Sequence, residues 1–268
     1  MHSHRFFTRD KLVFAHRGGA KLAPENTMAA FANGVTLGSD GIELDVHLSR
    51  DGVPVVIHDQ TLDRTTDATG RVSARTAAEL ACVDAGYRFT SADGAFPFRG
   101  RGIGVPTLEE VLTTFGDRRI IIEMKTGEPA LARAVATLVE CAGAAGRVCV
   151  GSFYDTGLAV IRAIAPAIAT SASEHEARWT LYRSWVRWPF GASRPYCAFQ
   201  VPERAGRLRV ISPPFIRQVH RDGARVDVWV VDDPADMKRM FAWGIDGVIT
   251  DRPDLAVPIT RSHRDHAE

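Results

Sequence analysis

The 268-residue sequence has few cysteines, no long apolar run near its start and almost no excess of either charge. Its four cysteines are scattered without a CxxC pair, which argues against a zinc site or a disulfide framework. We expect them to be reduced, buried and structural. Because 33 Lys and Arg residues balance 32 Asp and Glu residues, no overall field favours nucleic acid or an anionic membrane as a partner. Any anionic ligand must therefore be bound by local groups.

The first residues contain neither a secretion signal nor a membrane span, since no uninterrupted apolar run precedes Ala15. We therefore expect a cytoplasmic protein without stable membrane insertion. Hydrophobic residues make up 45% and charged residues 24%, which is typical of an ordinary globular protein and excludes disordered or collagen-like classes. The length fits one α/β barrel, so we expect a single domain over residues 1–268.

Short β-branched runs alternate with longer helical stretches, which is typical of a parallel α/β architecture. Several runs are apolar nearly throughout, as strands covered on both faces should be. The eight candidate strands span 12–18, 41–48, 119–125, 148–153, 168–173, 197–201, 226–231 and 247–251. The main candidate helices are one from an Asn26 cap to Gly38 and others near 107–115, 128–142, 156–165, 213–222 and 234–243.

Two stretches break this alternation. Residues 49–105 begin with a hairpin-like segment in which Asp51-Gly52 is a turn signal, and such a long departure inside a compact domain is usually a functional insertion. Residues 174–196 are rich in Trp and Arg and indicate an irregular helix or a lid.

Acidic residues recur at alternate positions of two candidate strands. Glu43 and Asp45 project from one face of GIELDVHL, and Glu123 and Lys125 share a face of RIIIEMK. If these strands are neighbours, three carboxylates converge beside a lysine, which is the ligand set of a hard divalent ion such as Mg²⁺ or Ca²⁺. A solvated strand end or an internal salt bridge to Lys125 would explain the same residues without a metal.

Two histidines are candidates for proton transfer. His16 and Arg17 end the first strand in FAHRGG, where the imidazole suits acid/base chemistry and the guanidinium matches phosphate oxygens. The two following glycines would let the backbone approach a ligand. His58 in VVIHD would complete an acid/base pair. A hydrogen-bonded structural histidine is the alternative at both positions.

Taken in order, FAHRGG, APENTMAAF, GIELDVHLSRDGVPVVIHDQTLDRTT, PTLEEVL, IIIEMK and VDVWVV…GIDGVITDRPD resemble the glycerophosphodiester phosphodiesterase family over nearly the whole chain. The resemblance implies a (β/α)8 TIM barrel with a small insertion after the second strand, at about residues 46–105. It also implies hydrolysis of a small-molecule glycerophosphodiester to glycerol 3-phosphate and an alcohol. The implied cofactor is a divalent cation, Mg²⁺ or Ca²⁺.

The family's functional positions are each occupied by a matching residue type. The resemblance implies catalytic roles for His16 and His58, substrate-binding roles for Arg17, Lys125 and Trp229, and metal ligation by Glu43, Asp45 and Glu123. We expect His16 to act as base and His58 as acid, while the attacking group is either water or the glycerol 2-hydroxyl. Asp232 stands where the family frequently has asparagine, and we interpret it as the cap of the helix that begins at Pro234.

Two other functions are compatible with these residues. Lysophospholipase D-type hydrolysis of a lysophospholipid would use the same centre, with the aromatic segments accommodating an acyl chain. A non-catalytic barrel that binds a phosphate ligand is expected to lack a histidine or a metal carboxylate, and none of these is missing.

Overall fold

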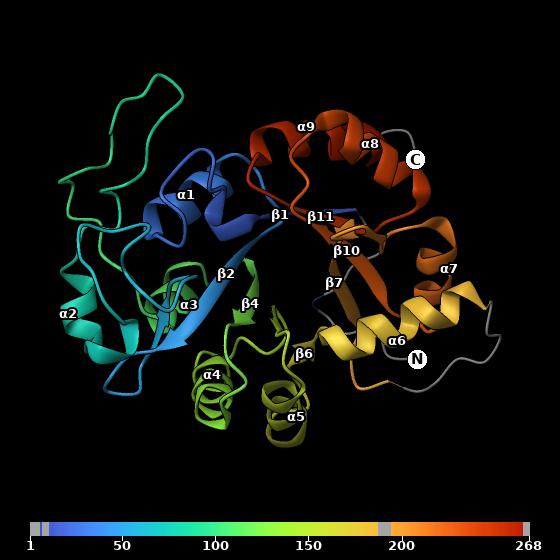
Figure 1. The fold of residues 1–268 in the computed structure, drawn as a ribbon, viewed down its shortest axis with the longest axis horizontal. Coiled ribbons are helices and arrows are strands. Elements are labelled where there is room, and N and C mark those ends of the chain that lie inside the picture. Colours follow the sequence, from blue (N-terminus) through green and yellow to red (C-terminus); the bar gives the residue numbers. More distant parts are fainter. Residues whose placement is uncertain (1–5, 7–10, 187–193, 265–268) are drawn as a thin grey trace.

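The computed structural model describes Phe6, residues 11–186 and residues 194–264, with side chains described as far as Arg261. A barrel of eight parallel strands is surrounded by helices (Figure 1). The barrel strands are β1 (Leu12–Ala15), β2 (Gly41–Leu48), β4 (Arg119–Met124), β5 (Val148–Gly151), β6 (Ala169–Thr170), β7 (Ala198–Pro202), β10 (Arg225–Trp229) and β11 (Gly247–Thr250). All eight predicted strands are present, and the predicted TIM barrel is confirmed.

The strands follow the order β6-β5-β4-β2-β1-β11-β10-β7, and each neighbouring pair is parallel. An isolated parallel bridge between Ser171 and Ala198 joins the two ends of this path. The carboxyl ends of all eight strands therefore meet at one end of the barrel, which is where barrel enzymes carry their active sites.

The helices cover the outside of the barrel and enclose two large apolar clusters. They are α1 (Met28–Thr36), α3 (Leu108–Thr114), α4 (Pro129–Cys141), α5 (Asp155–Ile164), α6 (Glu174–Trp185), α7 (Pro213–Arg221), α8 (Pro234–Trp243) and α9 (Pro253–Arg264). A short 3-10 helix, η1 (His16–Gly18), follows β1. No helix within the described residues is long and apolar enough to cross a membrane.

A third apolar cluster lies inside the barrel and extends to Ile121 and Ile249 on β4 and β11. Phe6 is fully buried there and stacks on Phe14, with ring centroids 5.9 Å apart. Cys149 belongs to the same cluster, but Cys82 and Cys141 are exposed, so the expectation of buried structural cysteines is wrong for those two. Within the described residues, side chains therefore fill the interior of the barrel, as in other TIM barrels.

The predicted insertion follows β2 and has a small core of its own. It begins with β3 (Pro54–Val56), which pairs antiparallel with β2, and continues through η2 (Val72–Ala74) and α2 (Ala77–Ala81). Its buried residues include Leu62, Val72 and Leu80. Figure 1 shows this segment, in cyan and green, beside β2 and outside the ring of barrel helices.

Two predicted helix caps are wrong by one residue. The Thr27 hydroxyl, and not Asn26, accepts the hydrogen bond from the Ala30 N–H at the start of α1. Asp233, and not Asp232, caps α8. The Trp- and Arg-rich segment contains a regular helix, α6, whose Ser173 and Glu176 form a capping box. Residues 187–193 of that segment lie outside the described residues.

Candidate active site

Three carboxylates meet at the carboxyl ends of β2 and β4, as predicted. Asp45 and Glu123 are register partners on these adjacent strands, and Glu43 lies two residues before Asp45 on the same face. One oxygen from each of the three residues lies within 4.8 Å of the other two. Glu43 and Asp45 are buried, and Glu123 is partly exposed.

Arg17 and Lys125 lie against this carboxylate cluster. Arg17 Nε is 3.1 Å from Asp45 Oδ2, while Lys125 Nζ is 3.0 Å from Glu123 Oε1 and 3.4 Å from Asp45 Oδ1. Burial alone would raise the pKa of Asp45, but the two cations outweigh it and lower that pKa. Asp45 is therefore an anion held between two positive side chains.

The pKa of Glu43 indicates that the nearby positive side chains do not neutralise all three carboxylates of the cluster. Burial, followed by repulsion from Asp45, raises the pKa of Glu43 to about 8. Burial and the charge of Asp45 also raise the pKa of Glu123. Oxygen ligands at this spacing with uncompensated negative charge are a donor set that suits a hard divalent cation. Glu43, Asp45 and Glu123 would hold such an ion.

Asp251, which was not predicted from the sequence, holds His16 beside the carboxylate cluster. The Nδ1 atom of His16 lies 2.7 Å from Asp251 Oδ1, and its Nε2 atom lies 4.0 Å from Glu43 Oε2. Burial acts to lower the pKa of His16, but the carboxylates of Glu43 and Asp251 outweigh it and raise the pKa. The adjacent Arg17 has a left-handed backbone, with φ of 50°, and donates its N–H to Glu43 Oε2 at 3.0 Å.

His58 has a different carboxylate partner. Its Nδ1 atom is 2.6 Å from Asp59 Oδ1, and Arg64 Nε donates to Asp59 Oδ2 at 2.7 Å. Arg64 also forms two 2.7 Å hydrogen bonds to Glu25, whose Oε1 accepts from Arg17 Nη1 at 3.0 Å. This chain of hydrogen bonds links the insertion, which carries His58 and Arg64, to the phosphate-binding candidate Arg17.

Asn26 forms hydrogen bonds to Asp45 of the carboxylate cluster and, contrary to the prediction, does not cap α1. It adopts a φ of 58°, and its Nδ2 donates to Asp45 Oδ2 at 2.8 Å. The backbone N–H of Asp45 donates to Asn26 Oδ1 at 3.2 Å in return. The signal available in the sequence was that asparagine tolerates left-handed backbone better than most residues.

The glycines of FAHRGG serve the packing of the barrel. A Cβ added to Gly18 would lie 2.6 Å from the carbonyl carbon of Ala30 in α1, and one added to Gly19 would lie 3.2 Å from Pro253. The expectation that these glycines also let the backbone approach a ligand stays a prediction. They let α1 and the start of α9 approach the loop that carries His16 and Arg17.

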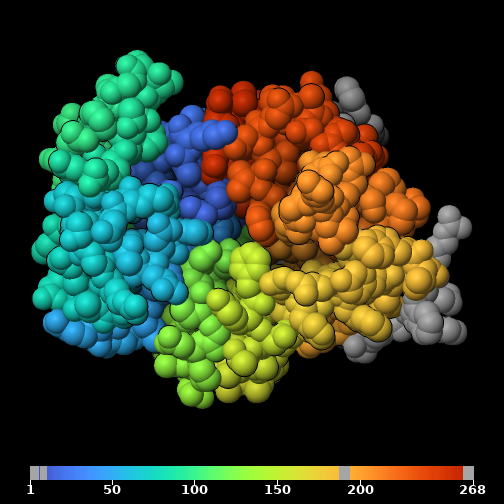
Figure 2. All heavy atoms as spheres, viewed as in Figure 1, coloured from blue at the N-terminus to red at the C-terminus, as the bar shows by residue number. Residues whose placement is uncertain are grey.

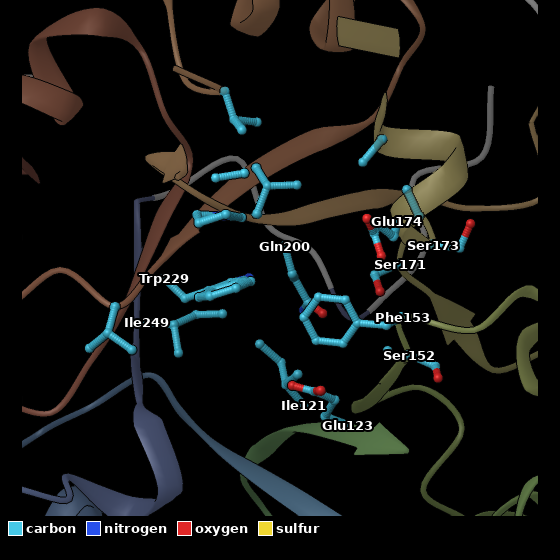
Figure 3. Close-up of a pocket in the computed structure, with 18 of the residues that line it drawn as sticks. Ile121, Glu123, Ser152, Phe153, Ser171, Ser173, Glu174, Gln200, Trp229 and Ile249 are labelled. Carbon is cyan, nitrogen blue, oxygen red and sulfur yellow. The ribbon is translucent and has the colours of Figure 1, made fainter. Parts of the chain in front are cut away.

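A cavity of about 710 Å³ opens at the carboxyl ends of the strands. Seven of the eight predicted site residues line it; Asp45 is buried behind them. Trp229, at the end of β10, packs edge-to-face with Phe153, with centroids 6.1 Å apart. Figure 3 shows both rings and Gln200 projecting into this space together with Glu123. Phe153 and Gln200 were not predicted from the sequence.

The chain is similar to known proteins over most of its length. The model of the glycerophosphoryl diester phosphodiesterase family matches residues 16–255. A glycerophosphodiester phosphodiesterase from Caldanaerobacter subterraneus subsp. tengcongensis is 34% identical over 255 residues, which cover 93% of this chain and 98% of the relative. The match spans the barrel and the insertion together.

Solved structures have the same fold. A glycerophosphodiester phosphodiesterase from Agrobacterium tumefaciens superposes with a TM-score of 0.75 at 31% identity, covering 92% of this chain and 98% of its own. The glycerophosphoryl diester phosphodiesterase domain of a Mycobacterium tuberculosis protein gives a TM-score of 0.80 at 24% identity, with 95% and 99% coverage, and supports the fold alone. From the family match and the identity over nearly its whole length, the chain belongs to the glycerophosphoryl diester phosphodiesterase family.

Proposed function

We propose that the chain is a metal-dependent enzyme that hydrolyses glycerophosphodiesters to glycerol 3-phosphate and an alcohol. The observation that carries the proposal is the convergence of three carboxylates within 4.8 Å, in a cavity that also receives two histidines and two cations. Lysophospholipase D-type activity is not favoured, because two relatives that match over 93% and 92% of the chain are named glycerophosphodiester phosphodiesterase.

The substrate phosphate would lie between Arg17, Lys125 and the carboxylate cluster. Both cations line the cavity, and their charge would stabilise the negative charge that shifts onto phosphoryl oxygens in the transition state. A divalent ion held by Glu43, Asp45 and Glu123 would supply Lewis-acid polarisation of the phosphoryl group. The chain itself provides the orientation of the phosphate and the proton transfers.

Each histidine would move one proton through its Nε2 atom. Because Nδ1 of each ring faces a carboxylate, Asp251 for His16 and Asp59 for His58, Nε2 is the nitrogen left to face the substrate. In the proposed reaction an attacking hydroxyl gives its proton to His16 as its oxygen bonds to phosphorus. The bond from phosphorus to the departing alcohol breaks, and His58 protonates that oxygen. The attacking group is water, which gives glycerol 3-phosphate directly, or the glycerol 2-hydroxyl. In the second case a cyclic phosphate forms, and water then attacks its phosphorus while the bond to the 2-oxygen breaks, which regenerates the hydroxyl.

The test is release of glycerol 3-phosphate from glycerophosphocholine with added Mg²⁺ or Ca²⁺, and with a chelator. His16→Ala and His58→Ala should each lower turnover about a hundredfold or more, the contribution expected of proton transfer. His175→Ala is the matched control, since this exposed histidine on α6 does not line the cavity.

Three outcomes would contradict parts of the proposal. Near-normal turnover by His58→Ala with metal present would remove His58 from proton transfer. Turnover that is unchanged by the chelator and by Asp45→Asn would exclude metal dependence. Faster hydrolysis of lysophosphatidylcholine than of glycerophosphocholine would instead favour the lysophospholipase D-type activity.

A further inference from the structure

The proposed chemistry does not use the aromatic face of α6. Among the residues of this helix and its end, Trp179 is 58% exposed, Tyr182 44%, Trp185 56% and Val186 71%. These four residues recur at helical spacing and so form one stripe, and the rings of Tyr182 and Trp185 are 5.2 Å apart. The solvent-facing side of a surface helix is normally polar, so a stripe of this composition indicates a binding surface.

A strongly basic hairpin lies beside this stripe. It consists of β8 (Arg204–Ala205) and β9 (Leu208–Arg209), and Arg204, Arg207 and Arg209 are all exposed. Tyr182 from α6 and Leu208 from the hairpin both line the cavity, so the two elements border the same opening. Figure 2 shows them side by side, α6 in yellow and the hairpin in orange.

The exposed face of α6 and the β8–β9 hairpin together carry a net positive charge. The acidic side chains of α6 and of the residue before the hairpin are Glu174, Glu176 and Glu203. They pair with Arg178, Arg162 and Arg239 respectively, and Arg239 also pairs with Asp236 on α8. Within the described residues, no carboxylate forms an ion pair with any of the three hairpin arginines. The chain as a whole carries a formal charge of only +1, so the positive charge here is local.

We propose that the exposed face of α6 and the β8–β9 hairpin dock on an anionic phospholipid surface, with the cavity opening beside it. Trp and Tyr have an apolar body and a polar edge, which is the chemistry that residues at a membrane interface share. Arginine side chains beside them are attracted by anionic headgroups. The contact is peripheral and requires no membrane-spanning helix.

The experiment is vesicle flotation with the full chain, comparing phosphatidylcholine alone with phosphatidylcholine containing phosphatidylglycerol. The chain should float with the mixed vesicles only, and high salt should release it. Trp179→Ser/Trp185→Ser and Arg207→Gln/Arg209→Gln should each weaken binding about tenfold or more. The matched control is Phe96→Ser/Arg101→Gln, an exposed aromatic and an exposed arginine in the insertion.

None of the four substituted docking residues lines the cavity. Turnover of dissolved glycerophosphocholine should therefore be unchanged, which shows that the variants are folded and separates this proposal from the catalytic one. Equal flotation with both kinds of vesicle, or undiminished flotation of both double variants, would overturn the proposal. A wild-type dimer in light scattering that is absent from Trp179→Ser/Trp185→Ser would also overturn the proposal. The stripe would then be covered by a second copy of the chain.

Discussion

His16 Nδ1 lies 2.7 Å from Asp251 Oδ1, although the two residues are near opposite ends of the chain. His16 directly follows β1, and Asp251 directly follows β11. The two strands pair in parallel with Ala15 opposite Thr250, so the residues that follow them lie side by side at the carboxyl end of the barrel. Asp251 is in turn fixed by its backbone N–H, which donates to Asp232 Oδ1 at 2.8 Å. This pairing orients the His16 ring.

Asp251→Asn should lower kcat about 10- to 100-fold, a smaller loss than the removal of a proton-transferring histidine itself. The amide keeps the shape of the carboxylate but no longer stabilises the protonated ring. KM should change little, because Asp251 does not line the cavity. Steady-state kinetics check this, with Asp254→Asn as control, since this partly buried carboxylate on α9 pairs with Arg252 and does not line the cavity. A kcat equal to that of the wild type would show that Asp251 does not act on His16.

Asn26→Ala should lower the free energy of unfolding by about 2–4 kcal/mol, because the buried Asp45 carboxylate loses one hydrogen-bond donor and the Asp45 N–H loses its acceptor. Alanine also disfavours the φ of 58° at this position. Asn26→Gly separates the two effects, since glycine adopts that φ without strain and should recover about 1 kcal/mol. Urea unfolding of both variants is the measurement. Equal stability of the two would mean that the left-handed backbone costs nothing here.

Metal binding near pH 7 should release close to one proton. With its pKa raised to about 8, Glu43 is mostly protonated at that pH in the metal-free protein and must lose the proton to bind a cation. Affinity should rise about tenfold per pH unit up to that pKa and then level off. Calorimetry in two buffers of different ionisation enthalpy measures the release, which should vanish in Glu43→Gln. Proton release at pH 9 equal to that near pH 7 would contradict this assignment.

His220 should make stability depend on pH far from the site. Its Nε2 atom is 2.8 Å from Asp246 Oδ2, and this hydrogen bond raises the pKa of His220. The stabilisation is fully present below the unfolded-state pKa of about 6.5 and is lost as pH rises through the higher folded-state value. The difference in Tm between wild type and His220→Gln should therefore shrink from about pH 6 to about pH 8.5. A difference that stays constant over this range would exclude the linkage.

The barrel and the carboxylate cluster could be predicted because their signals are local. Each strand is a short apolar run, and alternation along β2 places Glu43 and Asp45 on one face. Their convergence with Glu123 needed one further assumption, that the two strands are neighbours, and the register of Asp45 with Glu123 confirms it.

The missed features depend on contacts that no local pattern specifies. Asn26 and Thr27 are both favoured capping residues, and only the position of Asp45 on another strand decides which one caps α1. Asp232 and Asp233 present the same ambiguity at α8, where Asp232 instead binds Thr250, Asp251 and Lys21. The partner of His16 follows only from the pairing of the first strand with the last.

The adjacency of Asp45 and Glu123 also has a consequence for the order of folding. The whole insertion lies between these two residues in the chain, yet their strands pair directly. Bringing Asp45 and Glu123 together closes a long loop, which costs conformational entropy. Because only contacts formed afterwards offset this cost, we expect β2 and β4 to pair late in folding. A folding intermediate that already contains helices would then lack a cation site. A divalent ion should accordingly slow unfolding while leaving the first phase of refolding unchanged.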